Sequence, residues 1–213
     1  MKLEKLVPKY AWVPIICILA SIFATYHITM FVIDDSARHH IHMAIDDAIP
    51  FAPFFVVFYV LSFAQWALSW IMTGRESRQI CFRYAKAEII SRLLCMVCFI
   101  VYPTIIERPS LIVSDFFTWL MNVVWTFDRP VNCLPSMHVL SSAIAFFASF
   151  EVKKAGNWYR LLNGFMFVMC AASVVLTKQH YFIDIPAGII VAVIGLLAAG
   201  KMNNERFLWL RQR

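Results

Sequence analysis

Apolar residues in this chain form long runs separated by short polar connections, a pattern typical of helices that cross a bilayer. A membrane-spanning helix needs roughly 20 consecutive apolar residues, so the pattern predicts six spans. The expected spans cover approximately residues 11–33, 49–72, 92–106, 135–150, 161–176 and 185–199.

Composition excludes an ordinary soluble domain. Hydrophobic residues make up 61% of the chain and charged residues only 15%, against roughly 25% charged residues in globular domains. The 213 residues leave room for one membrane domain over residues 1–213 and for no extramembrane domain. The first apolar run is longer than that of a cleaved signal peptide, so we expect a retained helix. The expected fold is an all-α, polytopic bundle of six transmembrane helices.

Particular residues mark the third span and the connection after it. Arg92 stands at the start of the span, where its long side chain can extend to the interface. Pro103 is expected to kink or end this helix. The following connection, residues 107–134, is the longest, and we expect its Trp119 and Trp125 in the membrane interface, where indole rings are favoured.

The distribution of Lys and Arg predicts the orientation. The basic segments are the N-terminus and residues 74–92, 151–160 and 201–213. With an even number of spans all four lie on one side, and positive residues are retained in the cytoplasm. The net charge of +6 therefore serves topology and contact with anionic lipid. The three other connections face outward.

The outward segment Asn132–His138 contains a first candidate for chemistry. Pro135 is suited to the first turn of a helix, and a helix start offers unpaired N–H groups that favour an anion. Ser136 adds a hydroxyl donor, and His138 is placed to protonate an oxygen leaving from the bound anion. The alternative interpretation is a set of polar interface residues at a helix start.

The outward segment 178–184 contains the second candidate. His180 and Asp184 are four residues apart and share a face on a helical turn. A carboxylate bound to one ring nitrogen leaves the other as a base or nucleophile, the arrangement that a phosphohistidine mechanism needs. Lys178 could neutralise phosphate oxygens, or it could simply be solvated.

His42 and Asp46 repeat the His-x-x-x-Asp spacing on the same side, and together with His39, His40 and Asp47 they suggest a metal site. We favour a solvated loop that contacts lipid headgroups or caps the second span, or that lines the substrate entrance with residues 49–51.

Several function classes are not expected. The sequence has no glycine-rich phosphate loop, no metal-ligand cluster of credible spacing and no feature of nucleic-acid binding. We therefore expect neither nucleotide nor metal as a cofactor, and no nucleic-acid partner. Cys133 is the outward-facing cysteine, so no disulfide framework is implied.

In combination, the segments Pro135–His138 and His180–Asp184 resemble the motifs of the type 2 phosphatidic acid phosphatase (PAP2) superfamily of metal-independent lipid phosphatases and phosphotransferases. The segments Asp128–Asn132 and Gln179–Tyr181 more closely resemble the branch that includes the inositol-phosphoceramide and sphingomyelin synthases. The resemblance covers residues 108–188.

This resemblance implies a six-helix bundle with defined roles at the site. His180 would attack phosphorus, Asp184 would orient it, and His138 would protonate the leaving alcohol. Ser136, Asn132 and nearby cations would hold the substrate.

The chain also departs from the family pattern. Val101 stands where the family has a lysine seven residues ahead of Arg-Pro. Met137 replaces the glycine of Pro-Ser-Gly-His, and Val174 replaces a phosphate-binding arginine, for which Lys178 could substitute. The candidates for holding the phosphate oxygens are Arg108, Arg129 and Lys178.

These features predict a membrane enzyme that hydrolyses a lipid phosphoester on the outer face, with a substrate resembling phosphatidic acid or a polyprenyl phosphate. The first alternative is a phosphotransferase that moves a phospho-headgroup to a diacylglycerol- or ceramide-like alcohol. The second is a lipid-binding scaffold without catalysis. The small size favours a bacterial inner membrane with cytoplasmic termini.

Overall fold

The computed structural model describes residues 6–206, with side chains for residues 6–200, and its regular structure is helical throughout that part. The expected all-α class is therefore confirmed. The long helices are α2 (Trp12–Val32), α4 (Val56–Glu76), α5 (Arg78–Val101), α7 (Met137–Ser149), α8 (Asn157–Leu176) and α9 (Asp184–Arg206). Two shorter helices are α3 (Ala44–Ala48) and α6 (Phe116–Phe127), and single 3-10 turns lie at Lys9–Ala11, Asp35–Ala37, Pro53–Phe55 and Lys153–Ala155.

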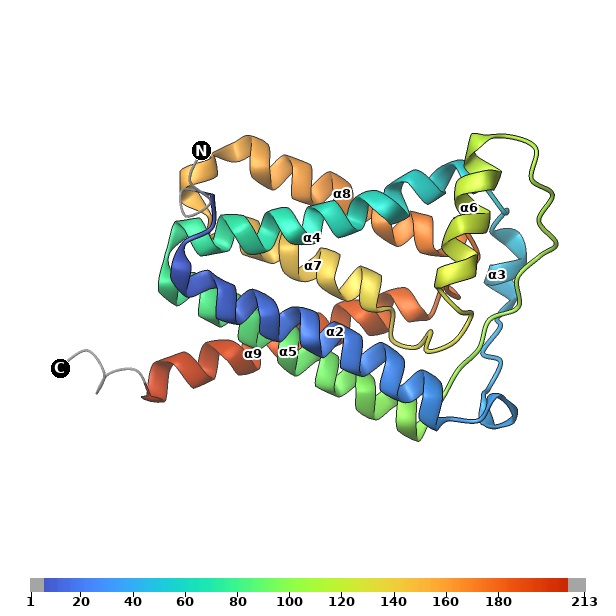
Figure 1. The fold of residues 1–213 in the computed structure, drawn as a ribbon, viewed down its shortest axis with the longest axis horizontal. Coiled ribbons are helices and arrows are strands. Elements are labelled where there is room, and N and C mark those ends of the chain that lie inside the picture. Colours follow the sequence, from blue (N-terminus) through green and yellow to red (C-terminus); the bar gives the residue numbers. More distant parts are fainter. Residues whose placement is uncertain (1–5, 207–213) are drawn as a thin grey trace.

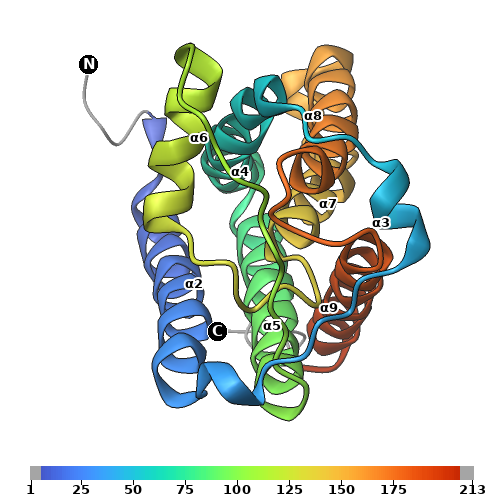
Figure 2. The same ribbon diagram turned by 90° about the vertical axis from the view of Figure 1, so that its right-hand side faces the viewer.

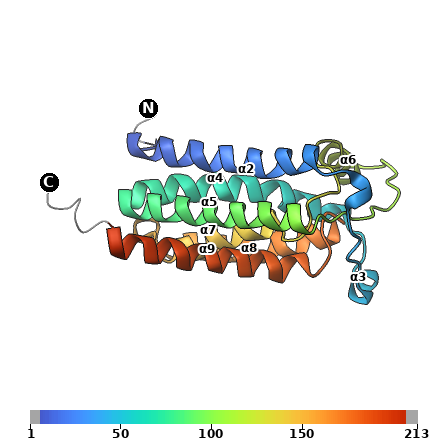
Figure 3. The ribbon, with the colours of Figure 1, turned by 90° about the horizontal axis from the view of Figure 1, so that it is seen from below.

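The long helices run side by side along the longest axis of the molecule (Figures 1 and 3). α5 lies at the centre of the bundle and packs against α2, α4, α7 and α9. The shorter helices α3 and α6 lie at one end together with the long connections, as Figure 2 shows. The turn from α4 to α5 and the turn from α7 to α8 lie at the opposite end.

Within the part of the chain that the structure describes, three helical segments are long and apolar enough to cross a membrane: Lys9–Val32, Pro53–Glu76 and Asn157–Leu176. They correspond to the expected first, second and fifth spans. Among the others, α7 has only 13 residues, or about 20 Å of helix, against a hydrocarbon core of about 30 Å. The apolar helices are compatible with an integral membrane protein, and half of the six expected spans meet the criterion of length and composition.

The prediction for the third span was wrong at its start. The basic stretch before residue 92 is itself helical, because Ser77 caps α5 by accepting the Ile80 N–H at 3.2 Å. The helix ends at Val101, before the expected boundary at residue 106, and Pro103 lies just beyond this end, in agreement with its expected effect.

Arg92 consequently lies inside α5 rather than at its end. It does not reach the interface, since it is only 1% exposed. Its guanidinium pairs with Glu88, one turn earlier, at 3.2 Å, and donates to the Ser141 hydroxyl of α7 at 2.6 Å. The i, i+4 spacing of opposite charges on one helix face explains why the side chain stays inside the bundle.

α7 and α9 approach closely where they begin. The Ser136 N–H donates to the Asp184 carbonyl at 3.2 Å. A Cβ added at Gly188 would lie 2.7 Å from the Ser136 carbonyl oxygen, so only glycine permits this approach. The contact brings the segments that carry His138 and His180 together.

Candidate active site

His180 and Asp184 form a buried pair at the start of α9. The His180 Nδ1 atom lies 3.0 Å from Asp184 Oδ2, and the same oxygen accepts the Tyr181 N–H at 3.0 Å. Asp184 is completely buried and His180 is 7% exposed. When Nδ1 carries the ring proton and donates it to the carboxylate, Nε2 keeps a lone pair and can act as a base or nucleophile.

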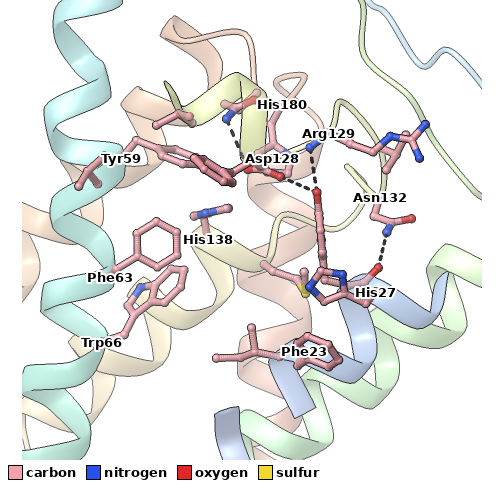
Figure 4. Close-up of a pocket in the computed structure, with 18 of the residues that line it drawn as sticks. Phe23, His27, Tyr59, Phe63, Trp66, Asp128, Arg129, Asn132, His138 and His180 are labelled. Atoms are coloured by element: carbon pink, nitrogen blue, oxygen red, sulfur yellow. Dashed lines mark hydrogen bonds between the residues drawn. The ribbon is translucent and has the colours of Figure 1, made fainter. Parts of the chain in front are cut away.

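His138 faces His180 across a cavity. The two ring centroids are 6.0 Å apart, with an interplanar angle of 63°. Tyr59, Phe63 and Trp66 of α4 surround the His138 ring at centroid distances of 4.2, 5.4 and 5.3 Å, as Figure 4 shows. The Nε2 atom of His138 is buried and has no hydrogen-bond partner. The structure thus brings two imidazoles from different helices to one cavity, where one nitrogen is free to exchange a proton.

The helix start differs in one detail from the expectation. Ser136 is the N-cap of α7, and Pro135 precedes the helix instead of occupying its first turn. The Ser136 hydroxyl accepts the Val139 N–H at 3.4 Å, and the residue is fully buried. Its first role in the structure is therefore to cap the helix.

Two chambers meet at His180. The first, which we call the apolar chamber, has a volume of about 630 Å³. Its walls include Phe23, His27, Phe63, Val124, Phe127 and His138. The second, the polar chamber, has a volume of about 840 Å³. Its walls include His40, Asp46, Glu107, Arg108, Lys178 and Tyr181. His180 is the residue that the two linings share.

The three candidate cations are divided between the chambers, and each has protein partners. Lys178 lines the polar chamber and donates to the carbonyls of Asp46 at 3.2 Å and Ile49 at 2.6 Å. Arg129 lines the apolar chamber and pairs with Asp35 at 2.8 Å.

Arg108 lies in the polar chamber. It donates to the Gln179 side chain and stacks over Trp125 at 5.2 Å from the ring centroid. Burial lowers the pKa of Arg108, and the Asp128 carboxylate acts in the opposite direction. Its Nε is buried without a hydrogen-bond partner, so the protein does not use every donor of Arg108.

Asn132 has a structural role on the wall of the apolar chamber. Its amide donates to the Thr29 hydroxyl at 2.8 Å and to the Tyr26 carbonyl at 3.3 Å. Its side-chain oxygen accepts from Arg38 at 3.2 Å. Asn132 therefore ties the segment before α7 to α2.

The sequence reasoning missed Asp128 as a site residue. Its carboxylate lines the apolar chamber and accepts from the Tyr26 hydroxyl at 3.1 Å, from the Tyr59 hydroxyl, and from Gln179 at 3.4 Å. The available signal was its position beside Arg129 in the family-like segment. Arg92 was missed as well, although a charged pair within an apolar helix is a signal in itself.

The repeated His-x-x-x-Asp spacing does not form a pair. His42 contacts Asp47 instead, at 2.9 Å. The Asp46 carboxylate accepts the backbone N–H groups of Met43 at 2.9 Å and Phe182 at 2.7 Å. Asp46 and Asp47 line the polar chamber together with residues 49–51.

One group of residues could hold a metal ion. Among the described residues, Cys133, His180 and Asp184 have ligand atoms within 4.8 Å of one another. Cys133 is buried. Burial raises the pKa of its thiol well above the usual value, and the Asp184 and Asp128 carboxylates raise it further. A metal binds the thiolate, so coordination here would require the Cys133 thiol to lose its proton.

Comparison with known proteins finds one match. The family model described as the PAP2 superfamily matches residues 37–198, a range that contains both histidines, Asp184 and most of both chambers. No curated protein matches the chain, and no solved structure does.

Proposed function

The chain belongs to the PAP2 superfamily, a membership that points to phosphatase- or phosphotransferase-type chemistry, and we propose that it hydrolyses the phosphoester of a membrane lipid without a metal, through a phosphohistidine at His180. The observation that carries the proposal is the pair of imidazoles 6.0 Å apart across one cavity, with Asp184 behind one of them.

The proposed reaction has two steps. Nε2 of His180 attacks phosphorus while His138, in its protonated form, gives its Nε2 proton to the leaving oxygen; a P–N bond forms and the P–O bond breaks. The Asp184 carboxylate accepts a hydrogen bond from the Nδ1–H of His180 and stabilises the positive charge that develops on the His180 ring. In the second step neutral His138 takes a proton from water, whose oxygen attacks phosphorus and releases phosphate and His180.

Water reaches the intermediate through the polar chamber, which His180 also lines. The polar lining on that side supports hydrolysis as the first candidate. The apolar chamber would hold the hydrocarbon part of the lipid.

Transfer to a lipid alcohol is the second candidate. Two observations favour it: the resemblance to the inositol-phosphoceramide and sphingomyelin synthase branch, and an apolar chamber next to the reacting ring, where an alcohol could replace water. The same residues would serve both reactions, because His138 would take the proton from either nucleophile.

The proposed orientation places the chambers on the non-cytoplasmic side. The Lys/Arg-rich turns between α4 and α5 and between α7 and α8 lie at the other end of the bundle, where positive residues favour the cytoplasm. A bacterial inner membrane would provide this arrangement.

The test is turnover by purified protein in detergent with EDTA, on a panel that contains phosphatidic acid and a polyprenyl phosphate. We expect phosphate release from at least one lipid, and none from His180→Ala. His39→Ala is the control, because His39 is exposed and stacks on Tyr102 away from the reacting rings; it should keep the activity.

Two outcomes would change the proposal. If added diacylglycerol or ceramide yields a labelled phospholipid at the expense of free phosphate, transfer replaces hydrolysis. A protein that binds lipid equally with or without His180 and releases nothing would be a scaffold.

A further inference from the structure

Arg92 is a buried cation on the wall of the apolar chamber that the proposed reaction does not use. It lines this chamber together with both histidines. Nη2 contacts Glu88 Oε2 at 3.2 Å and Ser141 Oγ at 2.6 Å, and Ser141 also donates to Glu88 at 3.1 Å. The charge of Arg92 is therefore balanced inside the bundle.

Two donor atoms of Arg92 are uncommitted. Nε is buried and has no hydrogen-bond partner. Nη1 contacts only the Met137 thioether, at 3.7 Å, and sulfur is a weak acceptor. Buried donors are nearly always paired, and Arg92 lines the apolar chamber, so these donors are available to an acceptor oxygen of a ligand in that chamber.

The position of Arg92 identifies the part of the ligand that it meets. Its contacts on α7 are Met137 and Ser141, which come one residue before and three residues after His138. The guanidinium thus lies beside the first turn of α7, toward the interior of the bundle. An oxygen bound there would belong to the lipid just beyond the phosphoryl group, where the hydrocarbon chains are attached.

The balance of charge identifies the kind of oxygen. A second anion would compete with Glu88 for Arg92 in an apolar surrounding, where unbalanced charge is costly. A neutral carbonyl oxygen accepts hydrogen bonds from the open donors without disturbing the pair.

We infer that Arg92, held by Glu88 and Ser141, binds an acyl carbonyl oxygen of the substrate and so selects ester- or amide-linked lipids over isoprenoid phosphates, which have no carbonyl. This inference rests on the proposed function and narrows its substrate class.

The test compares lipids that differ in the carbonyl. Wild-type protein is assayed for total P–O cleavage with diacyl phosphatidic acid, its dialkyl ether analogue of equal chain length, ceramide 1-phosphate and a polyprenyl phosphate. We expect kcat/KM for the better carbonyl lipid to exceed that of the ether and polyprenyl lipids by about 10-fold or more, the value of a hydrogen bond to a charged group. Of phosphatidic acid and ceramide 1-phosphate, the lipid with the higher kcat/KM shows whether the enzyme prefers an ester or an amide carbonyl.

Equal kcat/KM for the better carbonyl lipid and the ether lipid, or a preference for the polyprenyl phosphate, would overturn the inference while leaving the proposed function intact. No cleavage of any lipid would instead contradict the proposed function.

The double variant Glu88→Gln/Arg92→Met removes the donors and leaves no unpaired buried charge. We expect its ratio of ester to ether kcat/KM to fall to about 1. An unchanged ratio in a folded double variant would contradict the role of Arg92. Ser91→Ala is the matched control on α5, because the Ser91 hydroxyl donates to the Val191 carbonyl of α9 at 3.1 Å; it should keep the wild-type ratio. If the double variant does not fold, the inference is tested by the wild-type comparison of carbonyl lipids with the ether and polyprenyl lipids.

Discussion

Asp184 combines two functions in a single carboxylate oxygen. Oδ2 accepts from both the His180 ring and the Tyr181 backbone, so the turn before α9 and the ring orientation are fixed by the same atom. Its other oxygen is buried without a partner. A residue in this position cannot be exchanged for an amide without changing which ring nitrogen carries the proton.

Asp184→Asn should therefore lower kcat by about 100-fold or more, since the amide nitrogen donates where the ring must donate and the wrong tautomer is stabilised. Steady-state turnover of the best lipid from the panel measures this. Asp115→Asn is the control: Asp115 caps α6 by accepting the Thr118 N–H at 2.8 Å, and asparagine caps equally well. A wild-type kcat for Asp184→Asn would show that the carboxylate does not orient the ring.

The i, i+4 spacing correctly predicted the contact between His180 and Asp184, because both residues lie within one turn of chain, whereas the catalytic roles of His138, His180 and Asp184 stay predictions. The network around Asp128 could not be predicted, since its partners come from α2, α4 and the segment before α9. The same holds for Arg92, whose position was misjudged. Its contact with Ser141 joins residues 49 positions apart, and only the packed bundle reveals it.

At the scale of helices, the apolar runs predicted where most elements lie. The start of α5 was predicted wrongly, because its basic first half was interpreted as a connection. Its basic first half is helical because its buried face carries Cys81, Tyr84, Ala85 and Ala87, which pack inside while the basic side chains from Arg78 to Lys86 stay exposed or half-buried. Contacts between helices were not predictable. The close approach of α7 and α9 depends on Gly188, and nothing in the local sequence marks this glycine.

Gly188→Ala should separate the starts of α7 and α9, because the new Cβ would lie 2.7 Å from the Ser136 carbonyl oxygen. We expect a cost of about 1–3 kcal/mol in stability and a marked loss of kcat, measured by thermal unfolding and lipid turnover. Gly200→Ala in the same helix meets nothing within 4 Å and should keep both. Full activity of Gly188→Ala would show that the spacing of the two histidines tolerates movement of α9.

For the whole molecule, the arrangement of the connections links chemistry to topology. The lining of the apolar chamber includes Val124 and Phe127 of α6 and that of the polar chamber includes Asp46 and Asp47 of α3, whereas the basic turns lie at the other end of the bundle (Figure 1). His180 stands where the chambers meet, so lipid and water would approach it from different sides. Separate approach of lipid and water requires that the end with α3 and α6 faces an aqueous compartment and that the side of the bundle faces lipid.

Cysteine labelling can establish which compartment that is. Ile112 is 81% exposed in the connection before α6, and Lys153 is exposed in the turn between α7 and α8. In right-side-out vesicles, a membrane-impermeant maleimide should label Ile112→Cys directly and Lys153→Cys only after permeabilisation, because positive residues are retained in the cytoplasm. The parent chain, with its native cysteines, gives the background. The reverse pattern would place the chambers in the cytoplasm, and the proposed substrate would then have to be a lipid of the inner leaflet.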